Sequence, residues 1–142
     1  MILAIDTVDK TCAVGILKGA CPPCFARRCG RGKTSTVLFQ SRSKELLDVL
    51  EKFLAKEKVK IEDIKGIAAY LGPGESFTGT RVGIAVANAL SFALDMPTFG
   101  YCHIPEQNVE KRITQLLERS KNIKKFVKQV LTPVYARGAN IT

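Results

Sequence analysis

The sequence is poor in the side chains that most often carry out catalysis. It has no tryptophan, two methionines and a single histidine, His103, among 142 residues. One histidine excludes the paired-histidine metal motifs, and nothing around it resembles the nucleophile elbow of a Ser-His-Asp or Cys-His site. No apolar run reaches the roughly 18 residues of a membrane helix, so we expect no membrane span. This scarcity favours a binding or scaffolding role over catalysis.

Length and composition are those of a globular protein with one domain, or with one domain and a small appendage. Hydrophobic residues make up 46% and charged residues 25% of the chain, a balance that argues against disorder over most of its length. The N-terminal run Met1–Asp6 has no basic start and meets an acid at once, so we expect no signal peptide. The expected location is the cytoplasm.

Positive charge is concentrated in two segments of the chain. The formal net charge is +9, and basic residues gather in 18–36 and 101–142, on either side of a nearly neutral body. Such segments attract nucleic acid at long range, or they form a solvated surface that keeps the protein soluble; both interpretations stay open. Aromatic residues are few near them, so the pattern does not indicate base stacking.

The five cysteines do not predict a disulfide framework, because their number is odd and no export signal precedes them. Cys21, Cys24 and Cys29 have part of the spacing of a zinc site. Such a site needs four ligands, and the fourth would have to be a distant cysteine or His103. The three are therefore weak metal candidates, and the alternative is free thiols in a loop.

Hydrophobic patterning predicts a mixed five-stranded sheet with crossover helices. A continuous apolar run at the N-terminus is typical of a strand buried on both faces. Three consecutive strands form a meander, and two later strands join it through helices. Strands are expected at 1–7, 11–17, 34–40, 66–71 and 98–102, helices at 43–58 and 76–94, one long or two short further helices over 109–130, an irregular loop at 18–33, and an extended or irregular tail from 132.

The two predicted crossover helices differ in their apolar surface. The first has one leucine stripe, with Ser43 as the predicted N-cap. The second is apolar or small nearly all round, and Gly79, Gly83 and Ala87 recur every four residues along it. A crossover helix needs only one apolar stripe, so the extra surface is either core or a seat for a partner helix.

Two places in the sequence suit a phosphate or a divalent cation. Asp6 and Thr7 follow the first strand, where a carboxylate is well placed for Mg²⁺. Gly72 and Gly74 leave a strand and open a helix, whose N-terminal amides can hold a phosphate. The alternatives are an aspartate that caps a turn and glycines that only reverse the chain. Gly32-Lys33-Thr34 looks like the end of a P-loop, but the first glycine is missing and a strand follows.

Three segments of the sequence resemble the TsaB (YeaZ) family. They are Met1–Thr7, Ser43–Leu47 and above all the glycine-rich block Leu71–Gly83, and the ending from Pro133 is similar too. Members of this family are accessory proteins for formation of N6-threonylcarbamoyladenosine in bacterial tRNA. The resemblance implies an α/β fold of the actin-like ATPase or ribonuclease H-like type, in agreement with the strand order predicted above.

The resemblance also implies a non-catalytic role. Family members support a TsaD subunit, which carries metal-binding histidines and transfers the threonylcarbamoyl group; a TsaE-like ATPase joins the pair, and tRNA is met indirectly. The implied contact is a helix bundle, which would also serve a homodimer. No cofactor is implied, with ATP or ADP only at a partner interface. The implied interface residues are Ser43, Leu47, Leu50, Leu54, Ser76, Thr78, Gly79, Gly83, Ala87 and Leu90.

The chain departs from the family pattern in three ways. Arg42 precedes Ser43 where the family has a histidine, and Glu75 is an extra residue in the glycine-rich block. The second actin-like domain is largely missing, and a basic stretch stands in its place. We therefore expect a ribonuclease H-like domain at 1–103 and a basic helical segment with a C-terminal tail at 104–142.

Two other functions stay open. One is a nucleotide-binding phosphotransfer enzyme that uses Asp6 and the Gly72–Gly74 turn. The other is a basic RNA-binding module that acts alone. ATP turnover that is lost on Asp6→Ala would favour the first, and tRNA binding with a steep salt dependence and no protein partner would favour the second.

Overall fold

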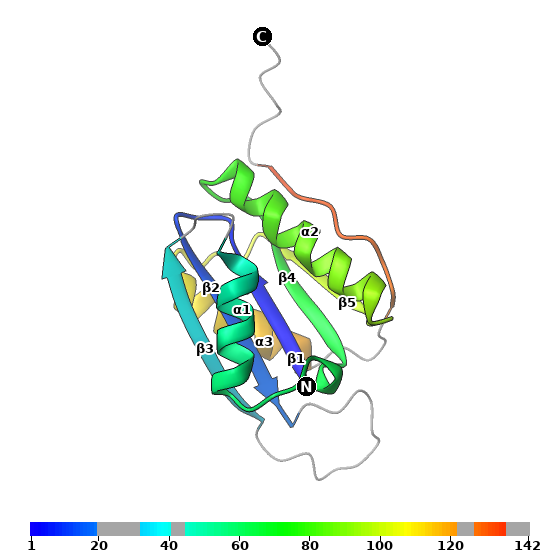
Figure 1. The fold of residues 1–142 in the computed structure, drawn as a ribbon. Coiled ribbons are helices and arrows are strands. Elements are labelled where there is room, and N and C mark those ends of the chain that lie inside the picture. The colour runs from blue at the N-terminus through cyan, green and yellow to red at the C-terminus, as the bar shows by residue number, and fades with distance from the viewer. Residues whose placement is uncertain (20–31, 41–44, 122–126, 136–142) are drawn as a thin grey trace.

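In the computed structural model, the described part of the chain forms one mixed sheet with helices on both faces (Figure 1). The structure describes residues 1–19, 32–40, 45–121 and 127–135. The strand order β3-β2-β1-β4-β5 confirms the predicted ribonuclease H-like α/β sheet. The strands are β1 Ile2–Asp6, β2 Thr11–Lys18, β3 Lys33–Gln40, β4 Gly66–Gly72 and β5 Thr98–Cys102; the helices are α1 Leu46–Lys56, the short 3-10 helix η1 Ile61–Asp63, α2 Phe77–Ala93 and α3 Val109–Lys121.

The central strand β1 is buried along its whole length, as its apolar run predicts. It pairs antiparallel with β2 and parallel with β4, so that Ile2 lies opposite Leu17 on one side and opposite Gly66 on the other. β3 pairs antiparallel with β2, which completes the predicted meander. The helical crossovers through α1 and α2 add β4 and β5 as parallel strands.

Two hydrophobic cores lie on opposite faces of the sheet. Alternation along β1 sends Leu3 and Ile5 to one face and Ile2 and Ala4 to the other. α1 and α2 cover the first face, and α3 covers the second (Figure 1). The first core includes Val14, Ile16, Leu50, Phe53, Ile67 and Ile84, and the second includes Leu17, Tyr70, Phe99, Ile113, Leu116 and Leu117.

The glycines of α2 let the helix approach the end of β1 closely. A Cβ atom added at Gly79 would overlap the backbone oxygen of Thr7, and one added at Gly83 would overlap the Thr7 hydroxyl. That hydroxyl donates a hydrogen bond of 2.7 Å to the backbone oxygen of Gly79. Gly79 and Gly83, which belong to the predicted stripe of small residues, therefore pack against Thr7 within this chain.

The helix predicted over 109–130 is right for its first part and wrong for its last residues. α3 ends at Lys121, and residues 127–130 are not helical. The extended segment 127–135 runs beside α2 instead (Figure 1). The Asn88 side chain accepts from the Leu131 amide and donates to the Leu131 oxygen, both at 2.9 Å, and Leu131 itself is buried. These side-chain bonds satisfy backbone groups that a helix would otherwise have paired.

Other predicted boundaries hold to within a few residues. α1 begins at Leu46 with Glu45 at its N-cap and no side-chain cap, whereas the predicted cap Ser43 lies outside the described residues. Most of the predicted loop 18–33 lies outside them as well. Lys33 is the first residue of the strand β3. A P-loop lysine would open a helix, so this agrees with the exclusion of a P-loop at Gly32-Lys33-Thr34. Within the described ranges, no helix combines the length and apolar character that a bilayer crossing demands.

Gly83→Ala should lower the free energy of unfolding by about 1–3 kcal/mol, because the added methyl group has no room beside Thr7. In a Thr7→Ala background the same change should cost clearly less, since the overlapping atoms are gone. Urea denaturation of the unsubstituted chain, the two single variants and the double variant measures both losses. Ala85→Ser on the exposed side of α2 is the control, and an equal loss in both backgrounds would contradict the contact.

Candidate functional site

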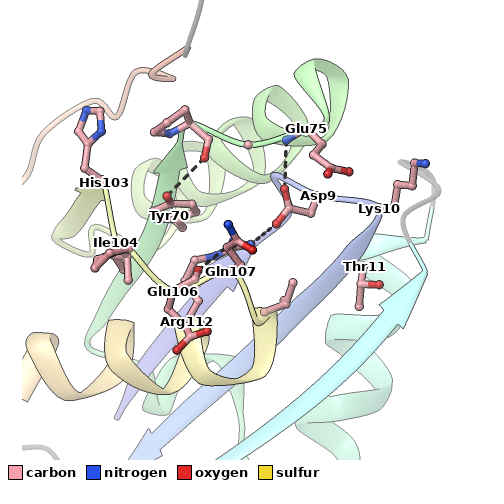
Figure 2. Close-up of a pocket in the computed structure, with 14 residues that line it drawn as sticks. Asp9, Lys10, Thr11, Tyr70, Glu75, His103, Ile104, Glu106, Gln107 and Arg112 are labelled. Atoms are coloured by element: carbon pink, nitrogen blue, oxygen red, sulfur yellow. Dashed lines mark hydrogen bonds and ion pairs between the residues drawn. The ribbon is translucent and has the colours of Figure 1, made fainter.

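A pocket of about 840 Å³ opens where β4 and β5 end (Figure 2). This carboxyl edge of the parallel strands is where α/β proteins usually bind ligands. Its walls come from the β1–β2 turn, the glycine-rich turn before α2, the segment after β5 and the start of α3. Its polar side chains include Asp9, Lys10, Tyr70, Glu75, His103, Glu106 and Arg112.

Arg112 of α3 forms the floor of this pocket and binds two carboxylates. Its Nε lies 2.6 Å from Asp6 Oδ2 and its Nη2 lies 3.1 Å from Asp6 Oδ1, a two-pronged ion pair. Nη2 also lies 2.6 Å from Asp9 Oδ2. The guanidinium carbon lies 4.7 Å from the centre of the Tyr70 ring. The Arg112 side chain is 5% exposed and that of Asp6 is 0%, so water screens this pair little.

Burial and charge act in opposite directions on the pair. Burial by itself would lower the pKa of Arg112, but the hydrogen bonds and charges of Asp6 and Asp9 outweigh it and raise that pKa well above its usual range. Burial raises the pKa of the Asp6 carboxyl, and the hydrogen bond and charge of Arg112 oppose that rise. Arg112 is therefore a permanent cation at the place where a bound metal would otherwise meet Asp6.

The predicted phosphate site is occupied by the chain's own groups. Of its four residues, Asp6 is bound by Arg112, and Thr7 donates to the Gly79 oxygen. In the turn that contains Gly72 and Gly74, the amides that follow also have internal acceptors. The Glu75 amide donates to Asp9 Oδ1 at 3.1 Å, as Figure 2 shows, and the Ser76 amide donates to the backbone oxygen of Val8 at 2.6 Å. Asp9 thus lies where an anion would sit.

Gly72 is required by its backbone and by its surroundings. Its φ of +105° lies in a region that side chains rarely adopt, and a Cβ atom there would overlap the Val134 oxygen. The Val134 amide donates to the Leu71 oxygen at 2.8 Å, so the segment 127–135 is tied to this turn. The glycine-rich block therefore works as a packing device at the start of α2.

The residues predicted to contact a partner divide between the inside and the outside of the chain. Ser43 lies outside the described residues, and the contact itself stays a prediction. The structure buries Leu50, Leu54, Gly79, Gly83 and Ala87 within the chain, leaves Leu47 and Thr78 exposed, and gives Ser76 and Leu90 intermediate exposure.

The predicted metal candidates cannot be placed, because Cys21, Cys24 and Cys29 lie outside the described residues. Cys12 is buried and Cys102 is exposed. In the part of the chain that the structure covers, no three side chains of His, Cys, Asp or Glu gather in a way that suits a metal ion. His103 lies at the pocket rim with a φ of +54°.

Sequence reasoning missed Arg112 and Phe92. Arg112 lies among the buried positions of α3, one helical turn before Leu116, and a charge in the apolar stripe was the available signal. Phe92 is 83% exposed on α2, away from the buried positions Ile84, Ala87 and Ser91. The available signal was an aromatic residue that does not belong to the buried positions of the helix, which indicates an exposed apolar patch.

Arg112→Met should destabilise the fold by about 3–5 kcal/mol, because it leaves the Asp6 carboxylate buried without a cationic partner. Without the guanidinium, the pKa of Asp6 in the folded state rises further above its unfolded value. The loss of unfolding free energy is therefore largest at neutral pH, where the carboxyl group would have to stay ionised. It should shrink as the pH falls through that raised pKa towards the ordinary range of aspartate. Chemical denaturation of both proteins at several pH values measures this.

The double variant Asp6→Asn/Arg112→Met removes both charges and serves as the matched control. It should be more stable than Arg112→Met alone at neutral pH, and its own stability should not depend on protonation of residue 6, because an asparagine does not titrate. A loss for Arg112→Met that is constant from neutral to acidic pH would contradict the buried ion pair.

Comparison with known proteins finds relatives that are named for tRNA modification. The model of the family described as TsaD, tRNA N6-adenosine threonylcarbamoyltransferase, matches residues 36–115, more than half of the chain. The tRNA threonylcarbamoyladenosine biosynthesis protein TsaB of Buchnera aphidicola subsp. Schizaphis graminum is 32% identical over 100 residues, which are 70% of this chain and 43% of that protein. The tRNA N6-adenosine threonylcarbamoyltransferase of Burkholderia thailandensis is 45% identical over 58 residues, 41% of this chain and 16% of that protein.

A solved structure agrees with the sequence comparisons. The YeaZ protein from Pseudomonas aeruginosa superposes with a TM-score of 0.58 at 27% identity, over 71% of this chain and 42% of that one. The chain therefore spans less than half of the length of these relatives. The match runs through β4, the glycine-rich turn and α2, the part of the fold that closes over the end of β1. The chain belongs to the TsaD family, and within it to the TsaB (YeaZ) group that its glycine-rich block indicates.

Proposed function

We propose that this chain is a non-catalytic accessory subunit in the formation of N6-threonylcarbamoyladenosine in tRNA. It binds a TsaD-type transferase subunit through the outer face of α1 and α2, and a TsaE-type ATPase joins that pair. The link to this modification of tRNA comes from the names of its relatives, TsaB and the threonylcarbamoyltransferase. The observation that carries the accessory role is the ion pair between Arg112 and Asp6.

That ion pair opposes a catalytic use of the pocket. A phosphotransfer enzyme needs its carboxylate free to hold Mg²⁺ beside the transferred phosphate. Here both oxygens of Asp6 accept hydrogen bonds from Arg112, and the residue is completely buried. Asp9 further places negative charge at the amide of Glu75, where a phosphate would need a donor. The alternative of a nucleotide-binding phosphotransfer enzyme is therefore the weaker proposal.

The outer face of α1 and α2 has the composition of a partner surface. Both helices lie on one face of the sheet, and no other helix or strand of the described residues covers their outer sides, although the segment 127–135 runs beside α2 (Figure 1). Leu47 is 57% exposed on α1 and Phe92 is 83% exposed on α2. On the exposed side of α2, the small side chains of Ala85 and Ala89 would let a partner helix approach closely. Large apolar side chains exposed on neighbouring helices favour an interaction surface over a merely solvated one.

Phe92→Glu and Leu47→Glu should each weaken binding to the TsaD-type subunit of the same organism by at least about ten-fold, because a charge would be buried at the contact. Co-purification of the two chains, followed by titration of the purified subunit, measures this. Both residues are exposed, so the isolated variants should unfold at the temperature of the unsubstituted chain.

Leu38→Glu is the matched control on the opposite side of the sheet. Leu38 is 44% exposed, and it pairs in register with Ala13, which belongs to the core under α3. This variant should bind the TsaD-type subunit as tightly as the unsubstituted chain does. Equal losses for all three variants would place the contact elsewhere, and no complex with the well-folded chain would remove the accessory proposal.

A further inference from the structure

Lysines from four parts of the chain meet at the end of the sheet opposite the pocket, where β1 and β4 begin. Lys18 ends β2 and Lys33 opens β3, and the two are direct partners in the antiparallel register. Lys65 precedes β4, and its amide donates to the Met1 oxygen at 2.8 Å, so it lies beside the start of β1. Since neighbouring strands are about 4.8 Å apart, these lysines form a row across the sheet edge.

The end of α1 adds three more lysines to this row. Lys18 Nζ lies 2.7 Å from Glu57 Oε2 and donates to the Glu57 oxygen at 2.9 Å, which joins the end of β2 to the end of α1. η1 follows directly and leads to the start of β4, and Figure 1 shows all of these ends together near the N-terminus. We call this surface the lysine edge; it consists of Lys18, Lys33, Lys56, Lys58, Lys60 and Lys65.

Positive charge exceeds negative charge on the lysine edge. Its nearby carboxylates are Glu57, Glu62 and Asp63. Glu57 already interacts with groups of this chain. Hydrogen bonds from Lys18 and Ser35 and the charges of Lys18 and Lys33 lower the pKa of its carboxyl group. Within the described residues, Lys18 alone of the six lysines makes an ion pair. Of the other five, Lys65 Nζ donates to the backbone oxygen of Glu62 at 3.2 Å, and none of the five has its charge paired with a carboxylate in these described residues.

Two of these lysines occupy positions that do not favour lysine. Lys33 stands directly opposite Lys18, and like charges in that position destabilise a sheet. Lys58 has a φ of +54°, a left-handed conformation in which glycine or asparagine normally ends a helix. A surface that only needs solubility can carry its lysines at unstrained positions. Placement against both preferences points to a use of the charge itself.

The two ends of the sheet carry opposite charge. At the carboxyl edge, Asp6, Asp9, Glu75 and Glu106 outnumber Lys10 and Arg112, so a polyanion is not attracted to the pocket. None of the exposed large apolar side chains of the described residues is next to one of these six lysines in the sequence. These apolar side chains are Leu38 and Leu47 at the far ends of β3 and α1, Phe77 and Phe92 on α2, and Val127 and Val130 beside α2. The lysine edge therefore lacks the apolar anchors of a membrane-binding surface.

We propose that the lysine edge binds the phosphate backbone of RNA. Ammonium groups spaced across strands neutralise consecutive phosphates without reading the bases, and the few aromatic residues fit that mode. The choice of RNA over other polyanions rests on the proposed function, in which the substrate of the complex is a tRNA. The inference goes further than that function, because it gives this chain a direct contact with the nucleic acid.

The test compares two double variants of the full chain that lose the same charge. Lys33→Thr/Lys58→Gly removes two lysines of the lysine edge, and Lys52→Ala/Lys111→Ala removes two exposed lysines from α1 and α3. Fluorescence anisotropy with a labelled tRNA transcript, between about 50 and 200 mM salt, gives the affinity and its salt dependence. Thermal unfolding is followed in parallel.

Lys33→Thr/Lys58→Gly should weaken RNA binding about ten-fold or more at low salt and reduce the salt slope by about 2. Its unfolding temperature should be no lower than that of the unsubstituted chain, because both changes relieve an unfavourable placement. Lys52→Ala/Lys111→Ala should keep nearly all of the affinity.

Equal losses in the two variants would reduce the effect to net charge and overturn the proposal. So would a chain that binds no RNA at 50 mM salt. Binding to phosphatidylserine vesicles that depends on Lys33 and Lys58, without binding to RNA, would assign the surface to a membrane instead. The assay contains this chain alone, so its outcome does not depend on whether a TsaD-type subunit binds to α1 and α2.

Discussion

The buried ion pair between Arg112 and Asp6 joins residues 106 positions apart and determines how the fold closes. Asp6 ends the central strand with no exposure to water, and a carboxylate in that position is strongly destabilising unless a cation accompanies it. α3 supplies that cation. Once Arg112 is in place, Ile113, Leu116 and Leu117 lie over the second face of the sheet, and the core there is complete.

The same ion pair organises the neighbouring turns. Arg112 also binds Asp9, whose other oxygen accepts the Glu75 amide, so one network runs from α3 through the β1–β2 turn to the start of α2. Gly79 and Gly83 then let α2 rest directly on Thr7. The side chains and amides that suit a phosphate in the sequence are therefore spent on contacts within the chain. This structural use of the site is the basis of the proposed non-catalytic role.

In the proposed function, the surfaces of this fold act rather than its pocket. α1 and α2 turn apolar side chains such as Leu47 and Phe92 to the outside, and the start of the sheet gathers its lysines. The two surfaces differ in physical character: the first suits burial against a protein, and the second suits long-range attraction of phosphates. A protein that bridges a protein partner and an RNA needs both kinds of surface, at places that do not overlap.

The sequence by itself determined the five strands and the positions of α1 and α2, because apolar runs, β-branched runs and helical stripes are local features of the sequence. It also determined the family, since the glycine-rich block is contiguous. Only the tertiary structure decided that Arg112 is the partner of Asp6, that Asp9 fills the place of an anion, and that the chain after α3 is extended on Asn88 and not helical. These contacts join residues far apart in the sequence, and an ion pair or a side-chain bond to a distant backbone leaves no periodic mark on either of its two segments.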